Sequence, residues 1–296
     1  MTLQLSTFYY LVFIDKLLYD LQKSSFGAKI SSLKVGNPTF ADKISLVTIT
    51  PADLQRLINI VHEYANLWKF EISIEKSCIV AFTRKRSLKY IPIYYGKSVL
   101  SVKTETVHLG MLQSSNGKVK EKILERCQKA KNAYYAISGM GVRSQGLNQV
   151  TAASIYKRIV MPVALYGSEL WNDMTKTDIT TLNRLQHFVA KTIQGFHKRT
   201  RSDMCESMLG LFRLSSEVDK RKLQFLHKIL SLPNHTISKQ IFIMKYVSFL
   251  NDRRSVKCGF IPDISKIVVK YGLQSILNYY VNKNLLPTKC EWKKPQ

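Results

Sequence analysis

The sequence is poor in acidic residues and in closely spaced cysteines. Asp and Glu together number 20 against 45 Lys and Arg, which gives a formal net charge of +25 over 296 residues. The five cysteines, Cys78, Cys127, Cys205, Cys258 and Cys290, are widely spread and form neither a CxxC pair nor a Cys/His cluster with zinc spacing. The sequence therefore excludes a structural zinc site and a disulfide framework of the usual kind. We interpret the cysteines as reduced thiols of an intracellular protein.

Long apolar runs, internal repeats and low-complexity segments are also missing. The apolar stretch "FYYLVFI" (8–14) is cut short by Asp15, and no basic region precedes it. It is neither a signal peptide nor a membrane span, and no other run is long enough to cross a bilayer. We expect an intracellular protein, nuclear or cytoplasmic, that does not act in a membrane.

The positive surplus is the strongest property that the composition does have. A charge of +25 favours a polyanionic partner, and nucleic acid is the commonest one. An acidic membrane surface would need a basic amphipathic helix or a polybasic run beside an apolar anchor, and the sequence has neither. A solvated basic surface without a partner remains the alternative.

Hydrophobic periodicity predicts an α+β fold, mixed in the first third and mostly helical afterwards. Helices are expected at 5–22 and 51–67, the second with Pro51 at its first position and a Thr50–Asp53 capping box. Short strands are expected near 28–35, 44–49, 70–74, 77–83, 90–95, 99–102 and 106–109, with the basic loop "RKRSLK" (84–89) between two of them.

After "SSNGK" (114–118) the pattern becomes helical. Helices are predicted at 118–138, at 148–171 with an interruption at Pro162, at 216–231 and near 270–282, together with one that begins at a Thr175–Asp178 capping box and ends at Gly195. We place a boundary near 112–118 and expect three parts: 1–112, 113–230 and a poorly defined helical extension, 231–296.

One turn carries a carboxylate with an unusual neighbour. In "VGNPTFADKISLVTIT" (35–50), turn residues and β-branched residues predict a strand, a turn and a second strand, with Asp42 at the tip and Lys43 beside it. Carboxylates at strand tips are what two-metal phosphoryl transfer requires. Alone, Asp42 is better interpreted as an ordinary turn residue.

Five short stretches in order change that interpretation. "FADK" (40–43) resembles the "YADD" hairpin of reverse transcriptases. The others are "LSTFYYLVFIDKLL" (5–18), "FEISIEKS" (70–77), "TVHLG" (106–110) and "MPVALYGSELW" (161–171), which are similar to the "LSP", strand–lysine, "YLG" and "PxLLYGSExW" elements of non-LTR (LINE-type) retrotransposon polymerases. Together they cover about residues 1–230.

The resemblance implies a polymerase architecture and a nucleic-acid partner. Residues 1–112 would form the second half of a palm and residues 113–230 a helical thumb and its extension, acting on an RNA template paired with a DNA primer. Asp42 would ligate Mg²⁺ and Lys76 would lie near the incoming nucleotide. His108, Leu109 and Gly110 would contact the primer backbone, where Gly allows a close approach.

The departures from the family pattern argue against catalysis. Lys43 occupies the place of the second Asp, and the upstream catalytic Asp and the fingers have no counterpart in this sequence. Asp15 and Asp20 lie on a predicted helix and do not replace that Asp. One remaining ligand beside a cation offers too few acidic oxygens for a pair of Mg²⁺ ions. We expect no polymerase activity from the chain alone.

Three hypotheses about function stay open. The chain is a decayed reverse-transcriptase fragment without activity, an enzyme whose missing palm half comes from another polypeptide, or a basic nucleic-acid-binding module. For the third, Lys118, Lys122, Arg126 and Lys129 line one flank of the 118–138 helix and either track phosphates or form a solvated surface.

Aromatic and histidine side chains give weaker signals. Tyr156, Tyr166 and Trp171 could stack on bases, but core packing is favoured. His187, His197, His227 and His235 have no triad or metal-ligand spacing, and we expect surface or core roles for them.

Overall fold

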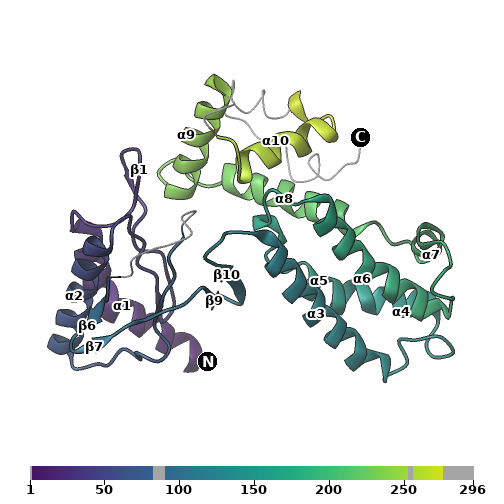
Figure 1. Cartoon of the computed structure of the whole chain (residues 1–296), viewed down its shortest axis with the longest axis horizontal. Coiled ribbons are helices and arrows are strands. Elements are labelled where there is room, and N and C mark those ends of the chain that lie inside the picture. Colours follow the sequence, from purple (N-terminus) through teal and green to yellow (C-terminus); the bar gives the residue numbers. More distant parts are fainter. Residues whose placement is uncertain (1, 83–90, 253–255, 276–296) are drawn as a thin grey trace. The chain divides into compact units, whose positions relative to one another are not determined.

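The computed structural model describes residues 2–82, 91–252 and 256–275, and it divides the chain into two compact units. The N-terminal unit comprises residues 1–106 and 114–116, and the helical unit comprises residues 107–113 and 117–296 (Figure 1). None of the described helices is long and apolar enough to cross a membrane. The fold class is α+β, as the sequence predicts, with all described strands before residue 115.

Two helices form the centre of the N-terminal unit. Helix α1 (Thr2–Lys23) packs against α2 (Pro51–Trp68) through the buried side chains of Leu17, Leu21 and Leu57. The predicted cap of α2 is present, because the Thr50 hydroxyl accepts a hydrogen bond from the backbone N–H of Asp53 at 3.1 Å. Both helices predicted for this region are therefore confirmed.

The strands of the N-terminal unit are only two residues long. β1 (Lys29–Ile30) pairs with β2 (Leu33–Lys34), β3 (Thr39–Phe40) with β4 (Lys43–Ile44), and β6 (Tyr94–Tyr95) with β7 (Ser98–Val99), all antiparallel, whereas β5 (Cys78–Ile79) pairs in parallel with β8 (Ser101–Val102). Each sheet has two strands.

The strand predicted at 70–74 is wrong. Phe70 and Ile72 pack against the α1–α2 core, but no neighbouring strand accepts their backbone hydrogen bonds. The predicted loop 84–89 lies outside the described residues.

Lys34 ties the β1–β2 hairpin to the end of α1. Its ammonium donates hydrogen bonds to the carbonyl oxygens of Leu21 and Gln22 at 2.7 and 2.8 Å. These carbonyls lie in the last turn of the helix, where they lack intrahelical partners and carry partial negative charge. Burial lowers the pKa of Lys34.

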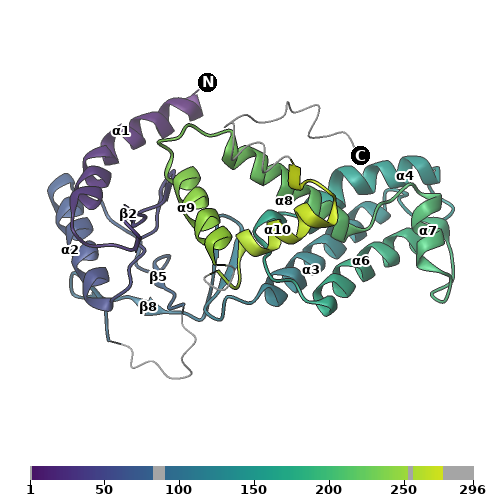
Figure 2. The ribbon, with the colours of Figure 1, turned by 90° about the horizontal axis from the view of Figure 1, so that it is seen from above.

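The helical unit is built from antiparallel and crossing helices over one large core. Its elements after the hairpin of β9 (Glu105–His108) and β10 (Met111–Ser114) are α3 (Val119–Ser138), α4 (Gln149–Ile155), a π-helical turn η1 (Tyr156–Val160), α5 (Met161–Ala164), a 3₁₀ turn η2 (Ser168–Leu170), α6 (Lys176–Gln194), α7 (Ser202–Met208), α8 (Leu214–Leu230), α9 (Ile237–Asn251) and α10 (Phe260–Lys270). Helices α3 and α6 run side by side (Figure 2), and Tyr134, Leu182 and Leu185 are buried in their shared core. A second core joins α8, α9 and α10 through Leu226, Phe242 and Ile264.

The capping box and the helix-ending glycine predicted for the helical unit are confirmed. Thr175 and Asp178 form a reciprocal capping box, and Gly195 ends α6 with a φ of 70°. Pro162 follows the π-helical turn, which widens the helix at the point where proline has no N–H to donate.

One helix was not expected, and two lie in the region predicted as a poorly defined helical extension. α7 has no counterpart among the predicted elements, whereas α9 and α10 lie within 231–296, which was predicted to be helical without bounds. α10 ends at Lys270, and Gly272 turns the chain with a φ of 66° before Gln274 and Ser275, which are helical. Most of the predicted 270–282 segment lies outside the described residues.

Candidate nucleic-acid interface

The "FADK" segment forms the hairpin that its sequence predicts. Phe40 pairs with Lys43 across the β3–β4 ladder, so Ala41 and Asp42 form a two-residue turn at the tip. Ala41 has a φ of 50°, in the left-handed region that two-residue hairpins use. The side chains of Asp42 and Lys43 are exposed.

A pair of Mg²⁺ ions requires several acidic ligands, and the β3–β4 turn supplies one, Asp42. Across the part of the chain that the structure describes, no three His, Cys, Asp or Glu side chains gather closely enough to hold a metal ion. Tyr10 of α1 is affected by Asp42, because its pKa is raised first by burial and second by the Asp42 carboxylate. We therefore assign no chemical step to a metal at Asp42.

Lys76 lies in an exposed turn between Phe70 and β5. The Ser77 hydroxyl closes this turn by donating to the carbonyl oxygen of Ser73 at 2.8 Å. Among the described residues, no hydrogen bond or ion pair links Lys76 to Asp42. The two residues with predicted catalytic roles are thus both solvent-accessible and not joined by a contact.

The "HLG" segment forms the turn of a second hairpin. β9 (Glu105–His108) and β10 (Met111–Ser114) are joined by Leu109 and Gly110, whose φ angles are 49° and 74°. Gly adopts such angles freely, but Leu does so at a cost in free energy. The turn must therefore be held by its surroundings.

Two side chains hold the carbonyl groups of this turn. The Tyr166 hydroxyl donates to the Leu109 carbonyl oxygen at 3.0 Å, and the Arg126 guanidinium donates to the Gly110 carbonyl oxygen. The guanidinium also lies 4.7 Å from the centre of the Tyr166 ring, within cation–π range. Residues 109–110, α3 and the segment after α5 therefore form one connected cluster in the helical unit.

Gly167 allows the close approach at this cluster. It has a φ of 73°, and a Cβ atom built on it would lie 2.5 Å from the Met111 sulfur. The cavity under the hairpin, lined in part by Gln113, Lys122 and Trp171, has a volume of only about 20 Å³. Space for about one water excludes a ligand here, so the contact between the hairpin and the helices is tightly packed.

The four basic residues predicted to line one flank of α3 do not share one environment. Arg126 is buried, and the half-buried Lys122 donates to the Gln113 side-chain oxygen at 3.1 Å. Burial lowers the pKa of Lys122. Lys118 is exposed at the helix N-terminus, and the exposed Lys129 pairs with Glu125 at 2.5 Å. Lys122 and Arg126 therefore contact the hairpin segment, while Lys118 and Lys129 stay accessible to a partner.

The three aromatic residues considered as base-stacking candidates also differ in burial. Tyr156 and Trp171 are buried in the core, as favoured from the sequence, whereas 47% of Tyr166 is exposed beside the turn.

Comparison of the chain with protein-family models, with curated proteins and with solved structures finds no match in any of the three. The function is therefore inferred from the arrangement of the chain's own residues.

A larger cavity in the helical unit was missed by sequence reasoning. Its volume is about 430 Å³, within the range typical of small-molecule sites. It is lined by Thr180, Asn183, Arg184 and His187 of α6, by Arg201, Ser202, Asp203 and Glu206 at α7, and by Arg213 before α8. The α6 residues are spaced i, i+3, i+4 and i+7, which places them on one helix face, and this spacing is a signal that was present in the sequence.

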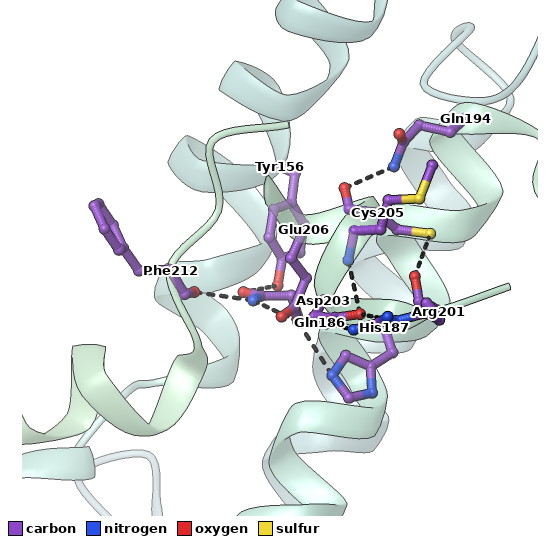
Figure 3. Close-up of polar contacts among 10 residues, drawn as sticks. Tyr156, Gln186, His187, Gln194, Arg201, Asp203, Cys205, Glu206 and Phe212 are labelled. Carbon is purple, nitrogen blue, oxygen red and sulfur yellow. Dashed lines mark hydrogen bonds and ion pairs between the residues drawn. The ribbon is translucent and has the colours of Figure 1, made fainter. Parts of the chain in front are cut away.

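A buried polar network supports one wall of this cavity (Figure 3). The Gln186 amide donates to Glu206 Oε1 at 2.9 Å and to the Phe212 carbonyl oxygen at 2.9 Å. Glu206 Oε1 also lies 3.2 Å from His187 Nε2. Burial lowers the pKa of His187 despite the opposing effect of Glu206, and Lys191 and Arg213 lower it further. Of the four histidines considered in the sequence, His187 thus lies beside a buried carboxylate.

Proposed function

We propose that the chain is a fragment related to the reverse transcriptases of non-LTR retrotransposons, which binds nucleic acid and does not polymerise by itself. The observation that supports this best is the contact between the "HLG" turn and the "LYGSELW" segment. The resemblance assigns both segments to one polymerase family, and Tyr166 and Leu109 are hydrogen-bonded although they lie 57 residues apart in the sequence. Two unrelated chance similarities would have no reason to contact each other.

The chemistry of the resembling residues argues against catalysis. Asp42 occupies a hairpin tip, as a metal-binding carboxylate of a palm would, but its neighbour Lys43 adds positive charge at the same turn. A cation a few ångströms from the carboxylate opposes the binding of Mg²⁺. Binding to nucleic acid needs neither metal nor carboxylates.

The net charge of +25 supports the binding function. Contacts between Lys or Arg and phosphates release condensed counterions, so such binding weakens steeply with salt. On α3, the exposed Lys118 and Lys129 are the accessible members of the basic row. Arg126 has a structural role at the hairpin, so its substitution would change folding together with binding.

Binding of the full chain to an RNA–DNA hybrid duplex tests the proposal. We expect fluorescence anisotropy to show binding that weakens as salt rises. A Lys118→Ala/Lys129→Ala variant should reduce the salt slope by about 2, because each lysine neutralises about one phosphate. The matched control is Lys228→Ala/Lys245→Ala, which removes the same charge from exposed positions of α8 and α9. Absent or salt-independent binding contradicts the proposal, and equal effects of both variants remove α3 from the interface.

Primer extension separates this proposal from an enzyme completed by a second polypeptide. We expect no incorporation from the chain with template, primer, nucleotides and Mg²⁺, and none after a separate fingers–palm polypeptide is added. Incorporation in the second assay would contradict the inactive fragment and favour the split enzyme. Lys43→Asp alone should restore nothing, because the upstream carboxylate has no counterpart in this chain.

A further inference from the structure

We infer that the cavity between α6, α7 and the start of α8 binds a phosphate monoester, as carried by a nucleotide or by the end of a nucleic-acid strand. The inference does not rest on the proposed function, because none of the five quoted stretches that resemble a polymerase lines this cavity. It rests on the balance of charge in the cavity, on its size and on the buried network behind it.

The acidic groups of the cavity are already paired. Asp203 accepts from the Arg201 guanidinium at 2.6 and 3.3 Å and from the Met204 backbone N–H at 3.0 Å. Glu206 Oε1 accepts a hydrogen bond from the Gln186 amide at 2.9 Å and lies 3.2 Å from His187 Nε2. Both carboxylates therefore have polar partners within the chain.

The remaining guanidinium groups are not paired. Arg184 and Arg213 line the cavity, and neither has a hydrogen-bond or ion-pair partner within residues 2–82, 91–252 and 256–275. Arg213 is close enough to His187 to lower the pKa of that imidazole, which places its charge near the buried network. An anion bound in the cavity would offset the positive charge of Arg184 and Arg213.

Phosphate fits these groups better than a carboxylate does. The planar donor fork of a guanidinium matches phosphate oxygens in pairs, and a phosphate monoester supplies three terminal oxygens for two guanidinium groups and a nearby hydroxyl. Ser202, which also lines the cavity, offers that hydroxyl. A volume of about 430 Å³ is larger than inorganic phosphate requires, so part of an attached sugar or base can enter as well.

His187 makes the site responsive to its ligand. Because Nε2 faces Glu206, the second ring nitrogen, Nδ1, is the one that gains a proton. A bound phosphate raises the pKa of this imidazole, and the protonated ring then adds a third positive group to the site. Gln186 keeps Glu206 in place as its partner, which keeps the ring fixed in either protonation state.

Isothermal titration of the full chain in phosphate-free, low-salt buffer tests the inference. The probes are inorganic phosphate, adenosine 5′-monophosphate, and an RNA tetranucleotide with either a 5′-phosphate or a 5′-hydroxyl group. We expect the monophosphate and the 5′-phosphorylated RNA to bind, and the 5′-hydroxyl RNA to bind at least about tenfold more weakly. Arg184→Gln and Arg213→Gln should each weaken binding about tenfold or more, as expected when a charge-assisted hydrogen bond is removed. Lys228→Gln/Lys245→Gln is the control for charge alone, and circular dichroism establishes that each variant is folded.

The outcomes separate the source of the ligand and test the site. Equal affinity for the monophosphate and the phosphorylated RNA supports a free nucleotide, and about tenfold tighter binding of that RNA supports a strand end. Equal affinity for the two RNAs, binding that Arg184→Gln and Arg213→Gln leave unchanged, or no binding of any probe at millimolar concentration overturns the inference. These results are independent of hybrid-duplex binding by α3, so failure of one proposal is distinguishable from failure of the other.

Discussion

The two units of this chain bury apolar surface in different ways. The helical unit encloses one large core between α3, α4, α5, α6 and α8, whereas the N-terminal unit has two small clusters, around Leu57 and around Ile58. Several large apolar side chains of the N-terminal unit are at least 60% exposed, namely Phe8, Tyr9, Val12, Phe40, Ile49, Leu67, Phe82 and Ile91. Because hydrophobic burial is the main favourable contribution to folding, we expect the helical unit to be the more stable of the two.

The difference follows from what each kind of element can cover. A ladder of two residues pairs few backbone groups and buries little on either face, and two-stranded sheets are marginal alone. A capped amphipathic helix such as α6 satisfies its own backbone and presents a continuous apolar stripe. The proposed origin would explain the exposed apolar groups of the N-terminal unit as surface that further palm strands would cover.

The largest effect is expected from a core truncation in the helical unit. Leu185 of α6 is 1% exposed in the main core, so Leu185→Ala should lower the free energy of unfolding of this unit by about 2–5 kcal/mol. Chemical denaturation followed by circular dichroism measures the change. Leu124→Ala, at a position that is 47% exposed on α3, is the control and should change it by about 0.5 kcal/mol or less. Equal effects of the two substitutions would contradict the described core.

The cores and capped helices of both units could be predicted from the sequence because their signals are local. Thr175, Asp178 and Gly195 mark the ends of α6 within the segment itself, and Asp42 lies at the predicted hairpin tip. Strand length could not be predicted, since a ladder ends where its partner strand turns away. Nor could the sequence show that Tyr166 reaches Leu109, because that contact depends on how α5 ends and how the hairpin folds back.

For the candidate functional residues, too, the sequence did not show contacts between distant segments. A row of four basic residues on α3 was visible from spacing, but spacing alone did not reveal that Arg126 is buried against the Gly110 carbonyl group. The cavity was missed because its walls come from three segments, and Glu206 becomes the partner of His187 only when α7 folds against α6.

A truncation in the N-terminal unit tests whether the two units unfold separately. Leu57 is fully buried between α1 and α2, and Leu57→Ala should destabilise this unit by about 2–3 kcal/mol, toward the low end because a small core relaxes more easily. Hydrogen exchange should show reduced protection in α1 and α2 and unchanged protection in α3 and α6. Reduced protection in all four helices would contradict the division into independently stable units.

The two capping threonines allow a matched comparison of smaller size. Thr175 takes part in a reciprocal capping box with Asp178, while Thr50 accepts from the Asp53 N–H and donates to the Asp53 carboxylate. Thr175→Ala and Thr50→Ala should each cost about 1 kcal/mol in their own unit. Denaturation of the full chain, followed by hydrogen exchange, assigns each decrease in stability to a unit. Ser substitutions keep the hydroxyl group and should largely restore stability, and failure to do so would show that the methyl group matters more than the cap.

The smallest expected effect is a pH dependence that belongs to the helical unit. Burial lowers the pKa of His187 in the folded chain below its ordinary value near 6.5, so the unfolded chain binds a proton more readily. The stability of the helical unit should therefore decrease as pH falls from about 7 through the ordinary pKa, and level off below the lowered one. His187→Gln should remove this part of the decrease, and thermal unfolding between pH 7 and pH 5 in phosphate-free buffer measures it.

Added inorganic phosphate should stabilise the unmodified chain more at pH 6 than at pH 7, and His187→Gln should remove that difference. This result would show that the protonated imidazole of His187 contributes to phosphate binding. A pH profile that the substitution leaves unchanged would instead assign the titration to another group of the helical unit.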